Sequence, residues 1–389
     1  MARKLRMGMV GGGPDAFIGD VHRKAARMDG KIELVSGMFS RTAEKSAQAG
    51  TAQFIDPSRV HSNIDAYIAA ELALPADERI DFVCICTPNS SHFSAAKAFL
   101  DAGFHVMCDK PLTTDLATAK EFRDVVAKSG LLFGLTHNYT GYPMVKLARD
   151  MVAAGDLGDV RKIVVKYPQG WLASAIDAEG QKQAEWRTDP AIAGASSCMG
   201  DIGTHAENLA EYITGLKMVR ICADLNAIVP GRRLDDDGNC LVHWENGVKG
   251  LLFASQISVG EENGLAINIY GTKSAIEWHQ EHPNWLHQHF PDQPSKVWKR
   301  GNDYIGAKSP AAGRATRIPF GHPEAFLEAF ANLYVNYAEA LNARLDGVDP
   351  DPLALDFPGI EDGVRGVAFI EACVESAKNG ATWVDFPTC

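Results

Sequence analysis

The chain has 389 residues, of which 46% are hydrophobic and 22% charged, and its formal net charge is −11. This length is enough for two domains with substantial cores. The acidic balance argues against nucleic-acid partners and anionic membrane surfaces, because both require a basic protein surface.

The start of the chain, MARKLRMGMV, is basic and then apolar, but three glycines follow at once. The apolar stretch is too short for the core of a signal peptide. No apolar run approaches the roughly 18 residues that a membrane helix needs. Eight cysteines are scattered along the chain, and Cys84 and Cys86 lie inside an apolar run. We therefore expect reduced core thiols in a cytoplasmic protein.

The first third of the chain alternates short apolar runs with helical patterns, which predicts a doubly wound parallel sheet. The run FVCIC is continuously apolar, as in a strand buried on both faces. A helix is predicted from about Gly19 to Met28. The predicted strands are residues 5–10, 32–39, 82–86, 104–107 and 131–135.

From about His137 onward, strand patterns follow one another without intervening helices, which predicts a mostly antiparallel sheet in an α+β domain. The segment 287–319 is rich in Pro, Gly and Lys and is interpreted as a long loop. Helices are predicted at 143–154, 323–344 and 360–377. Strands are predicted at 160–166, 219–225, 239–244, 248–257, 265–270, 275–278 and 382–386.

The stretch VGGGPDAFIGDVH follows the first predicted strand and opens the first helix. A dinucleotide-binding turn has the spacing G-x-G-x-x-G in this context. Gly11 and Gly13 fit the first two places, but five residues separate Gly13 from Gly19 where the fingerprint has two. The longer loop still offers amide donors and a helix N-terminus to a phosphate. The alternative is a glycine-rich turn without a ligand.

The second strand ends in Phe39-Ser40-Arg41-Thr42, without the acidic residue that usually contacts the ribose of NAD. Ser40, Arg41 and Thr42 could instead hold the 2′-phosphate of NADP. It is equally plausible that Arg41 stacks on adenine or is a solvated charge. The choice between NAD and NADP stays open on these residues.

Two further motifs follow strands at the carboxyl edge of the sheet, where ligands of doubly wound folds bind. Thr87, Pro88 and Asn89 follow the third strand, and Lys110 follows the fourth. The lysine could bind a substrate hydroxyl and stabilise developing alkoxide charge. The alternatives are a turn that caps the next helix and an ordinary surface lysine.

The sequence GDIGTHAENLAEYITG places Asp201 and His205 four residues apart, so that they share a face if the segment is helical. Histidine suits a general base, and a neighbouring carboxylate stabilises the imidazolium that forms. Asn208 and Tyr212 extend the same face. The alternative is that Asp201 caps the helix and His205 is structural.

A histidine-rich stretch, WHQEHPNWLHQHF, holds residue types that bind metals. Its spacing matches no metal motif, so we interpret it as a polar loop and predict no metal site. The residues in question are His279, Glu281, His282, His287 and His289.

Together these stretches resemble the glucose–fructose oxidoreductase and inositol dehydrogenase family (Gfo/Idh/MocA) over nearly the whole chain. The glycine loop ends in the family's G-x-x-H, at Gly19 and His22, and the family's E-K-P is present as Asp109-Lys110-Pro111. The remaining matches are Thr87-Pro88-Asn89 with His92, Asn138-Tyr139, Trp186-Arg187, Asp201 with His205, and Tyr270-Gly271-Thr272-Lys273.

The resemblance implies a Rossmann domain over residues 1–137 and, over 138–389, an α/β domain with a large open sheet that serves oligomerisation. The helix at 360–377 is expected to pack back near the first domain. The resemblance makes Lys110, Asp201 and His205 the catalytic residues. It implies cofactor contacts from Gly11, Gly13, Phe17, Ile18, Ser40, Arg41, Thr87, Pro88, Asn89, His92, Asp109, Lys110, Asn138, Trp186 and Arg187, and substrate contacts from Lys110, Tyr139, Asp201, His205 and His322.

The expected activity is hydride transfer between a secondary alcohol of a sugar, polyol or inositol and NAD(P), in a dimer or tetramer. The alternatives are an NAD-dependent glycosidase and a non-enzymatic cofactor- or sugar-sensing regulator. Two departures from the family pattern are Asp109 in place of Glu and a glycine loop three residues longer, with Pro14–Ile18 as the extra region. Trp171 and Trp285 could line a sugar pocket, although burial in a core is the commoner fate of tryptophan.

Overall fold

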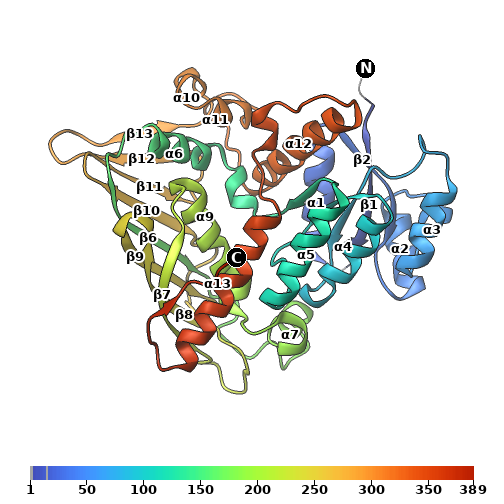
Figure 1. The fold of residues 1–389 in the computed structure, drawn as a ribbon, viewed down its shortest axis with the longest axis horizontal. Coiled ribbons are helices and arrows are strands. Elements are labelled where there is room, and N and C mark those ends of the chain that lie inside the picture. The colour runs from blue at the N-terminus through green and yellow to red at the C-terminus, as the bar shows by residue number, and fades with distance from the viewer. Residues whose placement is uncertain (1–2, 15) are drawn as a thin grey trace. The chain divides into compact units, whose positions relative to one another are not determined.

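The computed structural model describes residues 3–14 and 16–389, which form two compact units, each treated separately below (Figure 1). The first unit comprises the described part of Met1–Thr113, together with Ala117–Asn138 and Phe330–Val364. The second comprises Thr114–Leu116, Tyr139–Ala329 and Arg365–Cys389.

The first unit contains a parallel sheet with the strand order β2-β1-β3-β4-β5. The predicted strands are confirmed, with ends shifted by two residues at most. Strand order reverses between β1 and β3, so the loops that follow these two strands diverge around a crevice at the carboxyl edge. The strands are β1 (Leu5–Gly11), β2 (Ile32–Met38), β3 (Phe82–Cys86), β4 (His105–Cys108) and β5 (Phe133–Leu135).

Most of helix α12 (Phe326–Leu345) belongs to the first unit, far along the chain from the rest of that unit. The Tyr334 hydroxyl donates to Cys84 Sγ over 3.2 Å, and the Tyr337 ring lies 5.1 Å from the ring of Phe82. Burial of these two aromatic side chains on the parallel sheet attaches the helix to it. The other helices of this unit are α1 (Phe17–Met28), α2 (Ala43–Ala52), α3 (Ile64–Ala73), α4 (His92–Asp101) and α5 (Leu116–Ser129).

The second unit contains a nine-stranded sheet in the order β13-β12-β11-β10-β6-β9-β8-β7-β14. Its strand pairs are antiparallel except β6 with β9, among the residues described. The strands are β6 (Val160–Pro168), β7 (Met218–Asn226), β8 (Asp237–Trp244), β9 (Lys249–Ser255), β10 (Ala266–Gly271), β11 (Ala275–His279), β12 (Trp285–His289), β13 (Lys296–Lys299) and β14 (Val384–Asp385).

The interpretation of residues 287–319 as a long loop is wrong. The segment contains most of β12, all of β13, and helices α10 (Asp303–Lys308) and α11 (Pro310–Arg314). Strand β12 buries Leu286 and Gln288 on one face and leaves His287 and His289 less buried on the other. The strand is amphipathic, with histidines on its more exposed face. Its inward-facing Gln288 donates to Ser274 Oγ over 3.0 Å.

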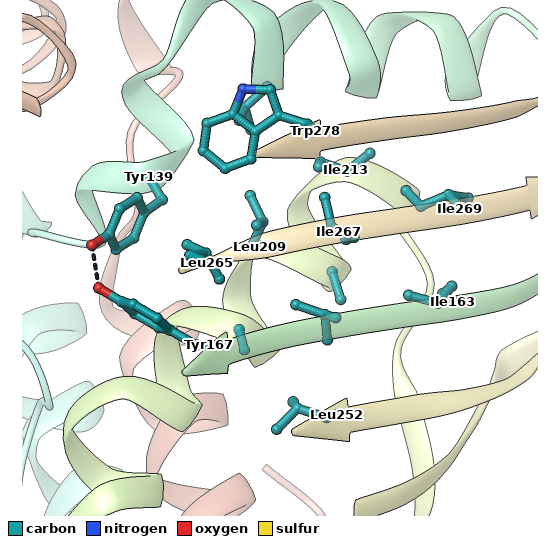
Figure 2. Packing of buried hydrophobic residues seen from close by; sticks show 14 of the residues in the cluster. Tyr139, Ile163, Tyr167, Leu209, Ile213, Leu252, Leu265, Ile267, Ile269 and Trp278 are labelled. Atoms are coloured by element: carbon teal, nitrogen blue, oxygen red, sulfur yellow. Dashed lines mark hydrogen bonds between the residues drawn. The ribbon is translucent and has the colours of Figure 1, made fainter. Parts of the chain in front are cut away.

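The core of the second unit lies between one face of the sheet and helices α6 (Pro143–Ala153) and α9 (Thr204–Thr214). Figure 2 shows Ile163 and Ile267 on adjacent strands, facing Leu209 and Ile213 of α9. On the opposite face Leu241, Leu251 and Tyr270 are 40–47% exposed. The other helices are α7 (Lys182–Arg187), α8 (Pro190–Ala193) and α13 (Ile360–Lys378).

All eight cysteines are free thiols, and six of them are buried, as predicted. Cys222 and Cys389 are half-buried. Within residues 3–14 and 16–389, no helix combines the length and apolarity needed to cross a membrane.

Candidate active site

The glycine loop after β1 is shaped by backbone contacts that exclude side chains. Gly11 has φ +94°, and a Cβ there would lie 2.7 Å from the carbonyl oxygen of Cys86 at the end of β3. A Cβ on Gly13 would meet the Phe39 oxygen at 3.0 Å, just beyond β2. The loop therefore approaches the ends of both neighbouring strands, as a dinucleotide-binding turn does. Of the extra region Pro14–Ile18, Asp15 lies outside the described residues.

Helix α1 begins at Phe17, two residues earlier than predicted, and its N-cap Ala16 offers no side-chain hydrogen bond. The amides of the first turn are thus available to an anion. Phe17 is largely exposed and Ile18 half-buried at this end of the helix. Their position fits the predicted cofactor contacts.

Arg23 is a contributor to this loop that the sequence did not reveal. The side chain is buried, and its Nη1 donates to the Gly12 carbonyl over 2.6 Å. Because Gly12 has φ +72°, this bond stabilises a backbone geometry that few other residues adopt. Its position directly after the G-x-x-H was the only signal in the sequence.

Thr87, Pro88 and Asn89 lie at the carboxyl end of β3, beside the glycine loop. The Thr87 Oγ1 atom is buried and has no hydrogen-bond partner within the described chain. A buried hydroxyl without a partner is a natural contact for a polar ligand. The alternative that this turn caps a helix is not met, because Ser91, the N-cap of α4, makes no capping bond.

His92, another predicted cofactor contact, lies between two loops at this edge of the sheet. Its Nδ1 is 2.8 Å from the Pro111 oxygen, and its Nε2 is 2.8 Å from the Thr87 oxygen. A neutral imidazole donates to only one of these two carbonyl groups, and the ring lies between the loop after β3 and the loop after β4. Burial lowers the pKa of His92 from its ordinary value.

Asp109 positions the loop that carries Lys110. Its Oδ1 accepts from the Lys110 amide over 2.9 Å and from Thr136 Oγ1 over 2.7 Å. The same oxygen lies 4.0 Å from Nε2 of His22, the histidine of the G-x-x-H. The shorter acid therefore has a defined set of partners at this strand edge. Asn138, another predicted cofactor contact, is buried shortly after β5.

Ser40 and Arg41 follow β2 and precede α2. Ser40 Oγ accepts from the Thr42 amide over 3.1 Å, and Arg41 is exposed. Together with the glycine loop, the α1 amides and the unpartnered Thr87 hydroxyl, this edge fits a nicotinamide dinucleotide. Ser40 and Arg41 lie where the adenosine ribose would be held.

In the second unit, Asp201 and His205 lie on a local irregularity rather than on one regular helix. Asp201 belongs to a π-helical turn, η4 (Met199–Gly203), and His205 belongs to α9. Such turns inside helices occur frequently at functional sites. Asp201 is not a cap, because the N-cap positions are Cys198 and Gly203.

The buried Asp235 carboxylate supports the start of this segment, a role that no local motif indicates. It accepts from the Ser197 and Met199 amides and from Ser196 Oγ, each over 3.0 Å. These bonds satisfy donors that the helix start would leave unpaired. Burial raises the pKa of Asp235, while the three hydrogen bonds act in the opposite direction.

One oxygen of Asp201 receives two donors. Arg187 Nε donates to Asp201 Oδ2 over 3.1 Å, and Gln256 Nε2 donates to the same atom over 3.0 Å. Arg187 also stacks over the Trp186 ring at 4.2 Å. The structure therefore joins Arg187, which was predicted to contact the cofactor, to the predicted catalytic carboxylate.

His205 is buried to 7% exposure and packs edge-on against the Tyr139 ring, with centroids 4.8 Å apart. The Tyr139 hydroxyl is hydrogen-bonded to that of Tyr167 (Figure 2). Farther along α9, Asn208 is buried, and the Tyr212 hydroxyl accepts from Arg149 over 2.7 Å. The end of the predicted polar face thus takes part in structural contacts.

His322 is exposed, and its backbone oxygen accepts from Arg300. The expectation that Trp171 and Trp285 lie in a core is wrong, because they are 36% and 47% exposed. His279 and His289 both contact Glu277, at 2.6 Å and 3.5 Å. Among the residues described, no group of three or more potential ligands has a geometry suited to a metal ion.

Comparison with known proteins identifies both parts of the chain. Residues 5–137 match the model of an oxidoreductase family with an NAD-binding Rossmann fold, and residues 145–277 match the GFO/IDH/MocA C-terminal domain. An oxidoreductase from Sinorhizobium meliloti is 43% identical, with a TM-score of 0.88 over 98% of this chain and 99% of its own.

Two relatives have been solved with ligands. An inositol dehydrogenase homolog from Azotobacter vinelandii, complexed with NADH and myo-inositol, is 33% identical, with a TM-score of 0.90 over 99% of this chain and 98% of its own. The levoglucosan dehydrogenase of Pseudarthrobacter phenanthrenivorans is 25% identical over 92% of this chain and 98% of its own. A levoglucosan dehydrogenase complex with NADH and levoglucosan has a TM-score of 0.82 over 99% of this chain and 100% of its own.

Proposed function

Because the chain belongs to the Gfo/Idh/MocA oxidoreductase family and has its NAD-binding domain, we propose that it oxidises a secondary alcohol of a cyclic polyol or sugar. The observation that carries this proposal is the placement of a buried histidine, His205, and a carboxylate, Asp201, on adjoining helical turns. The ligands named for the relatives, myo-inositol and levoglucosan, are both cyclic alcohols and support the substrate class.

In the proposed mechanism His205 takes the hydroxyl proton of the substrate as general base. The negative charge of Asp201 stabilises the imidazolium that forms. Lys110 donates to the reacting oxygen and stabilises developing negative charge there. When bound, a nicotinamide would supply the acceptor for the hydride that leaves the carbinol carbon. The residues that would hold it are those at the carboxyl edge of the parallel sheet, from the glycine loop to Asp109.

The direct test is the absorbance of reduced nicotinamide with NAD+ or NADP+ and a panel of inositols, pentoses, hexoses, anhydrosugars and glycosides. We expect reduction with at least one cyclic alcohol, and its loss in His205→Ala with cofactor binding retained. Full turnover of His205→Ala on the same alcohol would refute the role of this residue. Release of free sugar without net cofactor reduction would indicate a glycosidase, and tight cofactor binding without turnover would indicate a sensor.

We also infer a homo-oligomer that associates through the open face of the nine-stranded sheet. Leu241, Leu251 and Tyr270 expose large apolar side chains on that face. Light scattering of the wild type and of Leu251→Asp tests this inference. A monomeric wild type would contradict it.

A further inference from the structure

The carboxyl ends of β6 and β9 lie at the same edge of the nine-stranded sheet because these neighbouring strands run parallel. Antiparallel neighbours place their carboxyl ends at opposite edges. The pairing continues past the strands, since the Gln169 amide donates to the Ser255 oxygen over 2.7 Å. Four polar side chains collect at this edge, and we call them the strand-end platform: Tyr167, Gln169, Gln256 and Asn263.

Gln256 is the part of the platform that contacts Asp201. Its side chain is wholly buried, and its backbone is held on both sides: its amide donates to Asp236, and its oxygen accepts from Leu172. Its Nε2 donates to Asp201 Oδ2 over 3.0 Å, while its Oε1 is buried without a hydrogen-bond partner in the described chain.

Leaving an amide oxygen buried without a hydrogen-bond partner is unfavourable. Reversing the amide would place this oxygen against the carboxylate of Asp201. A hydrogen bond to an ionised acceptor is about twice as strong as a neutral one, which explains why the observed orientation is preferred. The orientation of Gln256 therefore matches an ionised Asp201.

The other platform residues fix Tyr139. Asn263 Oδ1 accepts from the Tyr167 hydroxyl over 2.7 Å and from Gln169 Nε2 over 2.9 Å. Since the Tyr167 hydrogen goes to Asn263, the Tyr139 hydroxyl must donate to Tyr167 (Figure 2). Asn263 Nδ2 in turn donates to the Tyr139 oxygen over 3.3 Å.

This hydrogen-bond pattern changes the expected role of Tyr139. Its only hydroxyl hydrogen is used inside the platform, so it cannot donate to a substrate. Burial raises the pKa of both phenols, and the charge of Asp201 raises each further, so they stay protonated. The anchored Tyr139 ring instead holds the His205 ring edge-on, at an interplanar angle of 86°.

We propose that the strand-end platform is the positioning element of the dehydrogenase site. Gln256 fixes the Asp201 carboxylate, and Tyr167 with Asn263 fixes Tyr139 against His205. The inference rests on the proposed function, since the platform residues act by positioning Asp201 and His205. Small displacements of reacting groups reduce rates strongly, by up to about 100-fold for 1 Å.

The test uses Gln256→Met, which keeps the side-chain volume but removes the donor, and Tyr167→Phe, which removes one oxygen. Gln288→Met is the matched control, because Gln288 is also buried in this sheet and donates to Ser274. Each variant is assayed with NAD+ and with the panel alcohol that gives the highest kcat/KM. Thermal unfolding is measured in parallel.

We expect kcat to fall about 10-fold or more in Gln256→Met and several-fold in Tyr167→Phe, with the KM for NAD+ unchanged. In Gln256→Met the acid limb of the kcat/KM profile moves to higher pH, because the ionised carboxylate loses a donor. Gln288→Met keeps the wild-type kcat and pH profile. A purely structural role would lower the unfolding temperature without moving the profile.

Asp201→Asn and His205→Ala are measured alongside to separate two kinds of failure. If they retain full activity, the proposed function itself is wrong. If they lose activity while Gln256→Met and Tyr167→Phe keep the wild-type kcat and pH profile, only the positioning role is overturned. Tyr167→Phe decides the outcome if Gln256→Met does not fold.

Discussion

Gly19 lies against Gly12 so closely that a Cβ on Gly19 would be 2.3 Å from the Cα atom of Gly12. The first turn of α1 therefore packs against the glycine loop at a distance that leaves no room for a side chain on Gly19. This contact is the packing role of the third glycine of the fingerprint, retained despite the longer loop.

Gly19→Ala is expected to displace the loop and weaken NADH binding by about 10-fold or more, since the clash is with backbone that cannot move aside. Fluorescence titration with NADH measures the Kd. Gly359→Ala is the control, because a Cβ there meets nothing within 4 Å. An unchanged Kd in Gly19→Ala would show that the loop does not hold the cofactor.

Lys110→Met is expected to lower kcat about 100- to 1,000-fold, the usual effect of removing one donor to a developing oxyanion. Its backbone position is maintained by Asp109, which accepts from the Lys110 amide. The Kd for NADH, measured in parallel, separates loss of chemistry from loss of cofactor binding. A kcat within a few-fold of wild type would exclude the assigned role.

Arg41→Ala tests the cofactor preference. Arg41 is exposed next to Ser40, and no acidic residue follows β2 before α2. If Arg41 pairs with a 2′-phosphate, its removal raises the KM for NADP+ about 10-fold and leaves the KM for NAD+ within about 2-fold. Equal effects on both cofactors would instead indicate stacking on the adenine.

Acid lability is expected from His105, whose Nδ1 accepts from the Leu132 amide over 2.8 Å. Burial, with a contribution from Arg344, lowers the pKa of His105 to about 4. Near pH 6.5 His105 binds a proton in the unfolded chain but not in the folded chain. The contribution of His105 to the free energy of unfolding is therefore present above pH 6.5 and is lost as the pH falls towards 4.

Within that window, His105 changes the free energy of unfolding by up to about 1.4 kcal/mol per pH unit. His105→Gln keeps an acceptor for Leu132 but does not titrate, so urea unfolding at pH 7.5 and pH 5 should show a smaller loss than in the wild type. His282→Gln, at an exposed position, should lose as much as the wild type. Equal losses in all three proteins would contradict the assignment.

Sequence reasoning identified the parallel sheet and most strands of the second sheet, and it nominated Lys110, Asp201 and His205, whose roles stay predictions. It succeeded where the signal is local: apolar strands buried on both faces and glycines required by backbone geometry. It failed for β12 and β13, because the histidines and lysines at their outward-facing positions made these short segments read as a polar loop.

Local patterns of residues were sufficient to recognise a dinucleotide-binding fold and a candidate base four residues from a carboxylate. The surroundings of these groups follow from the tertiary structure. It joined Arg187 and Gln256 on one oxygen of Asp201, directed the Tyr139 hydroxyl away from a substrate, and attached α12 to the parallel sheet. These relationships connect residues distant along the chain, and they depend on strand order and direction, which no local pattern of residues encodes.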